Sequence, residues 1–165
     1  MQSIAGRILN YLFYAEAAAA ILLYAMIAAL LACDVLLREV GVSFILGVQR
    51  MCVYAMIQTG FLGLGLAAAR GRHLRPRFAD ALVPKRFVPL VRRIGSFSMA
   101  AIFGYFIIFG VKFVMEAIEY GDLARTIKIP LWIVQLVVPY AFFSTALRYL
   151  IYGIFPDLNP EEKVE

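Results

Sequence analysis

The stretch GFLGLGLAAARGRHLRPRFADAL, residues 60–82, decides the fold because it changes abruptly from an apolar to a basic segment. Its first ten residues, 60–69, carry no charge, and four arginines follow within eight positions, at Arg70, Arg72, Arg75 and Arg77. An amphipathic helix of a water-soluble protein would distribute its charges along one face. The stretch therefore predicts a membrane-spanning helix that ends at a membrane surface.

The composition of the whole chain is that of a membrane protein. Of its 165 residues, 63% are hydrophobic and 16% are charged, and the mean hydropathy is +0.82. A helix needs about 20 apolar residues to cross a hydrocarbon core of about 30 Å. Charge-free windows of 17 or more residues occur at 17–33, 51–69, 94–111 and 129–147. We predict an all-α integral membrane protein, one domain over 1–165, with transmembrane helices at about 10–37, 48–69, 92–114 and 129–152.

The distribution of Lys and Arg predicts the topology, because cytoplasmic loops near membrane spans carry an excess of them. Eleven basic residues fall on one side of the predicted membrane: Arg7, Arg70, Arg72, Arg75, Arg77, Lys85, Arg86, Arg92, Arg93, Arg148 and Lys163. Five fall on the other side: Arg38, Arg50, Lys112, Arg125 and Lys128. Both termini and the basic loop between the second and third helices are therefore predicted to be cytoplasmic.

The basic loop is interpreted as an anchor on membrane lipids rather than as a nucleic-acid site. Near an anionic membrane surface each basic residue contributes about 1 kcal/mol, and topology already explains the excess charge. No nucleic-acid recognition motif accompanies it. The predicted anchor consists of Arg70, Arg72, His73, Arg75 and Arg77.

Small residues recur along the second predicted span. Thr59, Gly63 and Ala67 are spaced by four, which gives a smooth stripe where another helix backbone can approach. The stripe serves either contact within the four-helix bundle or docking of a separate membrane protein. In the fourth span, Pro139 leaves the Gln135 carbonyl without its helical partner and predicts a kink.

Glu16 is the one ionisable residue considered as an intramembrane site, since such residues are functional candidates by default. One interpretation is a proton-exchanging carboxylate, as in small multidrug exporters. The other places Glu16 at the cytoplasmic edge of the first span, because a full charge-free run follows it, and lets it reach the headgroups.

Catalysis, cofactors and metals are not predicted. A membrane haem commonly uses two axial histidines, and this chain has only His73. Cys33 and Cys52 lie in different spans without a metal-binding or redox spacing. The glycines of the second span lie inside an apolar helix, where a dinucleotide-binding loop is implausible.

Three stretches resemble the small membrane subunit of tripartite ATP-independent periplasmic (TRAP) transporters, that is, a DctQ-like protein. They are DVLLREVGVS at 34–43, FLGLGLAAARGRHLR at 61–75, and IPLWIVQLVVP with ALR at 129–139 and 146–148. The matching positions include Asp34, Arg38, Phe61, Leu62, Gly63, His73, Leu74, Pro130, Trp132 and Pro139. The sequence departs from the family at Gly47, Gln49 and Arg50, where the family commonly has a tryptophan followed by two glutamates.

The resemblance implies a non-catalytic subunit of a bacterial inner-membrane importer. In that family a periplasmic binding protein captures an organic acid, a large multi-span subunit moves it with sodium, and the small subunit enlarges the scaffold. Sodium is expected at the large subunit. The small-residue stripe and the kinked span predict large-subunit packing at Thr59, Gly63, Ala67 and Pro139. The basic outer helix ends predict binding-protein docking at Asp34, Arg38, Arg50, Arg125, Lys128 and Trp132, with structural support of the helix as the alternative for the Asp34–Arg38 pair.

Two other function classes stay open on the sequence. One is a self-contained proton-coupled exporter, in which Glu16→Gln would abolish transport. The other is the membrane anchor of an enzyme complex, in which haem or quinone would accompany the purified protein.

Overall fold

The computed structural model describes residues 2–41, 47–71, 88–124 and 128–159, and it is helical almost throughout. Four helical segments are long and apolar enough to cross a membrane, at Ile4–Glu39, Val48–Ala69, Arg93–Glu119 and Leu131–Ile154. The prediction of four such helices is confirmed. The element order is α1 (Gln2–Glu39), α2 (Val48–Ala69), α4 (Val88–Glu119), α5 (Leu131–Gln135), α6 (Val137–Ile154) and the short 3₁₀ helix η2 (Pro156–Leu158).

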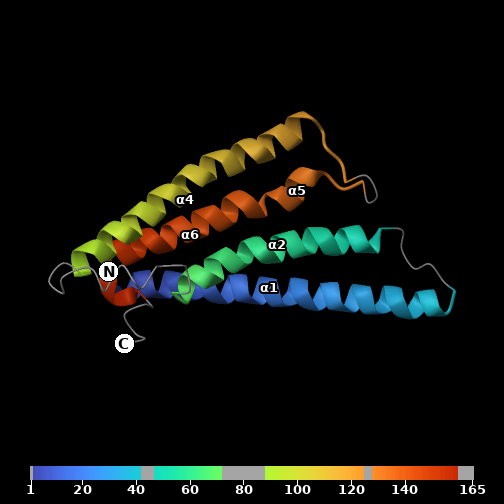
Figure 1. Cartoon of the computed structure of the whole chain (residues 1–165), viewed down its shortest axis with the longest axis horizontal. Coiled ribbons are helices and arrows are strands. Elements are labelled where there is room, and N and C mark those ends of the chain that lie inside the picture. Colours follow the sequence, from blue (N-terminus) through green and yellow to red (C-terminus); the bar gives the residue numbers. More distant parts are fainter. Residues whose placement is uncertain (1, 42–46, 72–87, 125–127, 160–165) are drawn as a thin grey trace.

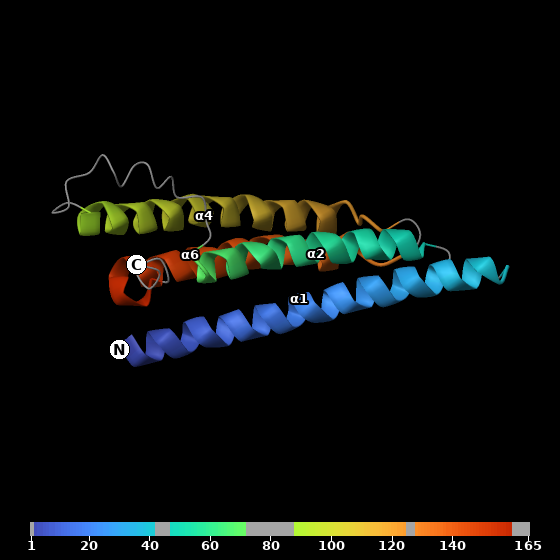
Figure 2. The ribbon, with the colours of Figure 1, turned by 60° about the horizontal axis from the view of Figure 1, so that its bottom comes forward.

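The helices form two antiparallel pairs, α1 with α2 and α4 with α6, which meet where α2 packs on α6. In Figure 2, α2 and α6 lie between α4 on one side and α1 on the other. The helices converge where α1 begins and α6 ends, and they spread apart toward the opposite end (Figure 1). Because the chain passes along the bundle four times, its two ends lie at the same end of the bundle, as the prediction of two cytoplasmic termini requires. Which side of a membrane this end occupies stays a prediction.

The first helix is longer than the predicted span of 10–37. It begins at Gln2 and runs for 38 residues, or about 57 Å at 1.5 Å per residue. The helix ends at Glu39, and Gly41 then adopts a left-handed φ of 76°, a conformation that commonly ends helices. The helix therefore extends 14 residues before Glu16.

The fourth predicted span, 129–152, is divided into α5 and α6 by a one-residue interruption at Leu136. Pro139 has no N–H, so the carbonyl of Gln135 four residues earlier receives no helical hydrogen bond from it. The interruption falls directly after Gln135. The predicted kink is thus located where the missing donor would place it.

The α4–α6 pair packs closely through glycine and aromatic residues. A Cβ on Gly110 would lie 3.2 Å from Pro139 Cα, so the absent side chain lets α4 approach the proline. Farther along, the Phe103 ring stacks on Tyr149 with centroids 6.1 Å apart, and Phe61 of α2 contacts Phe142 of α6 edge-on at 6.0 Å. These contacts hold α2, α4 and α6 together as one packed unit.

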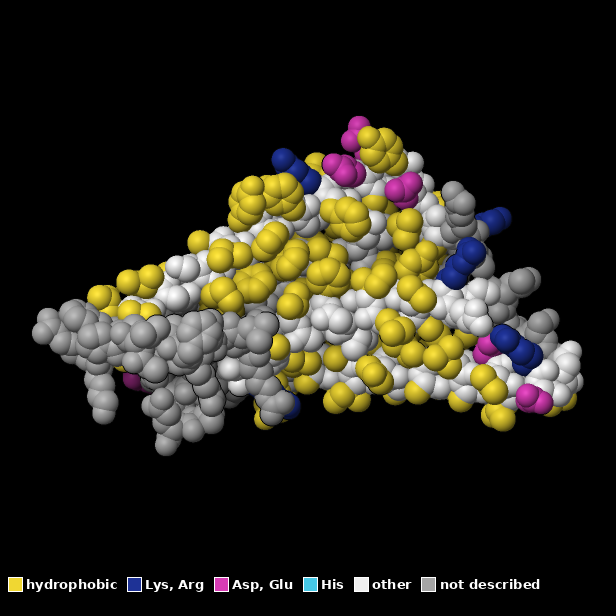
Figure 3. All heavy atoms as spheres, viewed as in Figure 1, with side chains coloured by type: hydrophobic (Ala, Val, Ile, Leu, Met, Phe, Trp, Pro, Cys, Tyr) yellow, Lys and Arg dark blue, Asp and Glu magenta, His cyan; other side chains and the backbone are white. Residues whose placement is uncertain are grey.

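Most of the remaining apolar surface is exposed, as expected of a membrane protein without its lipid. Large side chains such as Tyr11, Leu22, Phe109 and Met115 are between 49% and 77% exposed. Figure 3 shows hydrophobic side chains over most of the visible helix surface, with most visible charged side chains toward the helix ends. Lipid or another subunit must cover this surface.

Candidate functional site

Three buried polar residues of the described chain, Glu16, Ser144 and Arg148, form a cluster around one ion pair between α1 and α6. Arg148 Nη1 lies 2.9 Å from Glu16 Oε2, and the two side chains are 0% and 2% exposed. Ser144, one helical turn before Arg148, donates its hydroxyl hydrogen to Glu16 Oε1 and accepts a hydrogen bond of 2.9 Å from Arg148 Nη1. The Tyr140 hydroxyl also donates to Glu16 Oε1, at 3.4 Å. Together these groups form a compact polar cluster within otherwise apolar helices.

Gly65 of α2 makes this cluster possible. A Cβ built on Gly65 would collide with Glu16 Oε2 and with Arg148 Nη1, so a larger residue here would have to displace the paired side chains. Gly65 is five residues before Arg70, about 7.5 Å along the helix axis. The ion pair between α1 and α6 is therefore covered by α2. It lies between one and two helical turns from the end of α2.

Two sequence interpretations are corrected by this arrangement. The interpretation that the Glu16 side chain reaches the headgroups is wrong, because its carboxylate is buried against Arg148. The count of Arg148 among the cytoplasmic basic residues is wrong too, because its side chain has no exposure. Charge-free windows were used to mark the membrane, and such windows exclude a charged residue even where an opposite charge neutralises it.

Sequence reasoning missed Tyr140, Ser144, Arg148 and Gly65 as parts of a site. A signal existed, since the three α6 residues are spaced by four and therefore share one helix face. Glu16 directly precedes the first charge-free window and Arg148 directly follows the last, so the sequence also offered these two as an ion pair. The sequence contained no indication of which helices would meet.

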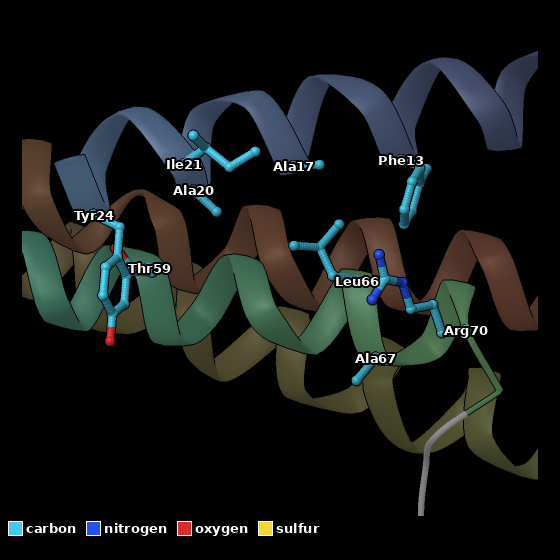
Figure 4. Close-up of a pocket in the computed structure, with 9 residues that line it drawn as sticks. All are labelled: Phe13, Ala17, Ala20, Ile21, Tyr24, Thr59, Leu66, Ala67 and Arg70. Atoms are coloured by element: carbon cyan, nitrogen blue, oxygen red, sulfur yellow. The ribbon is translucent and has the colours of Figure 1, made fainter.

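Two of the three residues of the small-residue stripe on α2 border a cavity between α2 and α1. Thr59 and Ala67 line a cavity of about 430 Å³ between the two helices, and Phe13, Ala17 and Ala20 line its α1 side (Figure 4). Gly63, the third stripe residue, is half-buried, and a Cβ there would meet no atom within 4 Å. The other helices of the bundle thus leave space beside Gly63, whereas they pack closely against Gly65.

Other predicted site residues have different surroundings. Pro139, predicted to contact a large subunit, packs against Gly110 of α4 within the chain. Asp34 and Arg38 form an ion pair of 2.8 Å, in which the Arg38 side chain is 68% exposed. Arg50 and Lys128 are exposed and Trp132 is half-buried. Arg125 lies outside the described residues.

Only the first residue of the predicted lipid anchor is described. The Arg70 guanidinium lies 5.6 Å above the centre of the Phe13 ring, at one end of the cavity between α1 and α2 (Figure 4). Arg72, His73, Arg75 and Arg77 lie outside the described residues. In the part of the chain that is described, no group of three His, Cys, Asp or Glu residues is placed to hold a metal ion, and both cysteines are unpaired.

Four apolar helices braced by a buried ion pair define a polytopic α-helical membrane protein. The model of the family described as tripartite ATP-independent periplasmic transporters, DctQ component, matches residues 27–154. The chain belongs to this family, the small permease component of TRAP transporters, as the sequence resemblance predicted.

A curated relative supports the same assignment. The chain is 29% identical over 100 residues to the ectoine TRAP transporter small permease protein TeaB of Halomonas elongata. The alignment covers 60% of this chain and 51% of that relative, so about half the length of the relative is matched. No solved structure matches the chain.

Proposed function

We propose that this chain is a non-catalytic scaffold subunit in sodium-coupled, binding-protein-dependent uptake of an organic acid. Family membership supports the role as the small permease of a TRAP transporter. The coupling ion and the substrate class follow from what the family resemblance implies. The relative is named for ectoine, so ectoine belongs beside simple carboxylates among the first compounds to test.

The observation that carries the scaffold role is the closed Glu16–Arg148 pair. A proton-coupled exporter needs a carboxylate that a substrate can reach. Glu16 is 2% exposed, is ion-paired with Arg148 and receives hydrogen bonds from α6. The cavity between α1 and α2 is lined by neither residue of the pair. This arrangement favours a bracing role for the charges over a transport role.

The partner proposed for the exposed apolar surface is the large multi-span subunit. Large apolar side chains of α1, such as Tyr11, Leu22 and Tyr24, are between 68% and 77% exposed, which leaves an apolar surface that a partner can cover. Part of this surface is proposed to pack on the large subunit, and the rest to contact lipid.

The second proposed partner is the periplasmic binding protein, at the end where α1 finishes and α2 begins. Arg50 and Lys128 are exposed at helix or loop ends on this side, and Arg125 lies near Lys128 in sequence. Basic groups here would steer an acidic surface toward the membrane complex and raise the rate of encounter. Arg38 and its ion-pair partner Asp34 lie at the same end of the bundle, at the end of α1.

Purification from mild detergent tests the proposed function. The tagged chain is expected to retain a large multi-span membrane protein in a fixed ratio, identified by mass spectrometry. Purification as a self-associated protein alone would support the exporter, and retention of haem or quinone with an enzyme would support the anchor. Either result would contradict the proposal.

A further inference from the structure

The cavity between α1 and α2 extends about as deep as one leaflet of a bilayer. Its α2 wall runs from Thr59 to Arg70 and its α1 wall from Phe13 to Tyr24. Each wall covers eleven residue steps, or about 16 Å of helix axis, close to half of a hydrocarbon core of about 30 Å. A transmembrane helix of another subunit would need a surface that crosses both leaflets. An extended acyl chain needs only one.

Of the residues that line the cavity, only Arg70 is charged, and it lies at one end. Arg70 is exposed where α2 finishes, and its guanidinium lies over Phe13. Deeper in the cavity, Ala17, Ala20 and Ala67 offer only methyl groups. The Thr59 hydroxyl at the far end donates to the Ala55 carbonyl at 2.8 Å, so its hydrogen is already used. Figure 4 shows Arg70 and Phe13 at one end of the cavity, with Tyr24 and Thr59 at the other.

We propose that this cavity binds an anionic phospholipid, with one acyl chain along α1 and α2 and its phosphate beside Arg70. The positive end of the cavity lies where α2 leaves the predicted hydrocarbon core, at the depth of lipid headgroups. The proposal requires only that the helices cross a membrane and does not depend on the transport role.

Native mass spectrometry of the membrane complex tests the site. The complex is purified in mild detergent, stripped of lipid, and titrated with phosphatidylglycerol or with phosphatidylcholine of the same acyl chains. Arg70→Gln is expected to weaken phosphatidylglycerol retention about fivefold, the equivalent of about 1 kcal/mol for one basic residue near a headgroup. Retention of phosphatidylcholine is expected to stay unchanged, and Arg70→Lys to restore most of the preference.

A second variant pair tests occupancy of the cavity itself. Ala67→Leu places a larger side chain in the cavity and is expected to lower retention of both lipids. Ala101→Leu makes the same change at an exposed position of α4 and is expected to have no effect.

Three results would overturn the proposal: wild-type phosphatidylglycerol retention by Arg70→Gln, unchanged lipid retention by Ala67→Leu, or loss of a co-purifying membrane protein instead of lipid in Ala67→Leu. The last result would assign the cavity to a partner helix. Lipid retention is compared between variants of this chain, whichever proteins accompany it. A failure of the proposed transport role would therefore change the partner and leave the lipid result intact.

Discussion

Glu16 of α1 and Arg148 of α6 form a buried ion pair of 2.9 Å between helices whose backbones otherwise make few contacts. The pair brings together residues 132 positions apart in the sequence. A single unpaired charge inside a membrane-spanning segment is costly. Two opposite charges in contact offset much of this cost and give α1 one defined position against α2 and α6.

The first prediction concerns the coupling of these two charges. Glu16→Gln and Arg148→Gln should each lower the free energy of unfolding by about 3 to 5 kcal/mol, because each leaves one buried charge unpaired. The double variant should lose clearly less than the sum of the two. Denaturation of the purified complex in detergent measures all three.

Asp34→Asn is the matched control for this cycle, since it breaks an exposed ion pair on the same helix. It should cost only about 0.3 to 0.5 kcal/mol. Additive losses in the Glu16 and Arg148 variants would show that the two charges are not coupled. Transport per assembled complex should also survive Glu16→Gln, which separates bracing from proton exchange.

The second prediction compares two glycines on α2. Gly65→Ala should destabilise the protein by about 1 to 3 kcal/mol, because its Cβ would collide with the ion pair. Gly63→Ala should be neutral or stabilising by up to about 1 kcal/mol, because its Cβ meets open space and alanine favours helix. Thermal unfolding in detergent distinguishes the two variants. Equal effects would mean that α2 does not lie over Glu16.

Hydropathy was sufficient to predict four membrane helices, because long charge-free windows have few alternatives. The kink of the fourth helix was equally local, since Pro139 acts on a carbonyl four residues away. The site around Glu16 could not be predicted in this way, because it is formed by residues of three different helices. The position of Glu16 depends on Arg148 and on the missing side chain of Gly65, and no pattern within one helix shows which helices will meet.

The small-residue stripe illustrates the same limit. The spacing of Thr59, Gly63 and Ala67 identified a smooth face, but spacing alone does not specify what covers it. In the structure Thr59 and Ala67 line a cavity against α1, whereas the glycine that packs inside the bundle is Gly65. Burial separates the two glycines, and the sequence does not.

The third prediction concerns topology. Without Arg148 the predicted basic residues divide ten to five in favour of the side that carries the 70–93 loop. Reporter fusions after Arg77 and at the C-terminus should therefore report the cytoplasm, and a fusion near Gly121 the periplasm. Arg148→Met should not change these signals, because its charge is buried. A periplasmic signal after Arg77 would reverse the proposed orientation.

The fourth prediction concerns docking of the binding protein. Reversing Arg50 and Arg125 to Glu should slow binding-protein-dependent uptake by about tenfold at low salt, since steering depends on complementary charge. The effect should shrink near 0.1 M salt, where the screening length is about 10 Å. Expression and assembly with the large subunit should not change. Wild-type uptake at every ionic strength would exclude a docking role for these charges.

The most direct test of the scaffold role is uptake into proteoliposomes that contain the large subunit with or without this chain, supplied with the binding protein and a labelled organic acid. Uptake is expected only when all three proteins are present, and it should follow a sodium gradient. Vesicles that contain this chain alone should show no transport under either a sodium or a proton gradient. Proton-driven transport by this chain alone, or full sodium-driven uptake without it, would contradict the account.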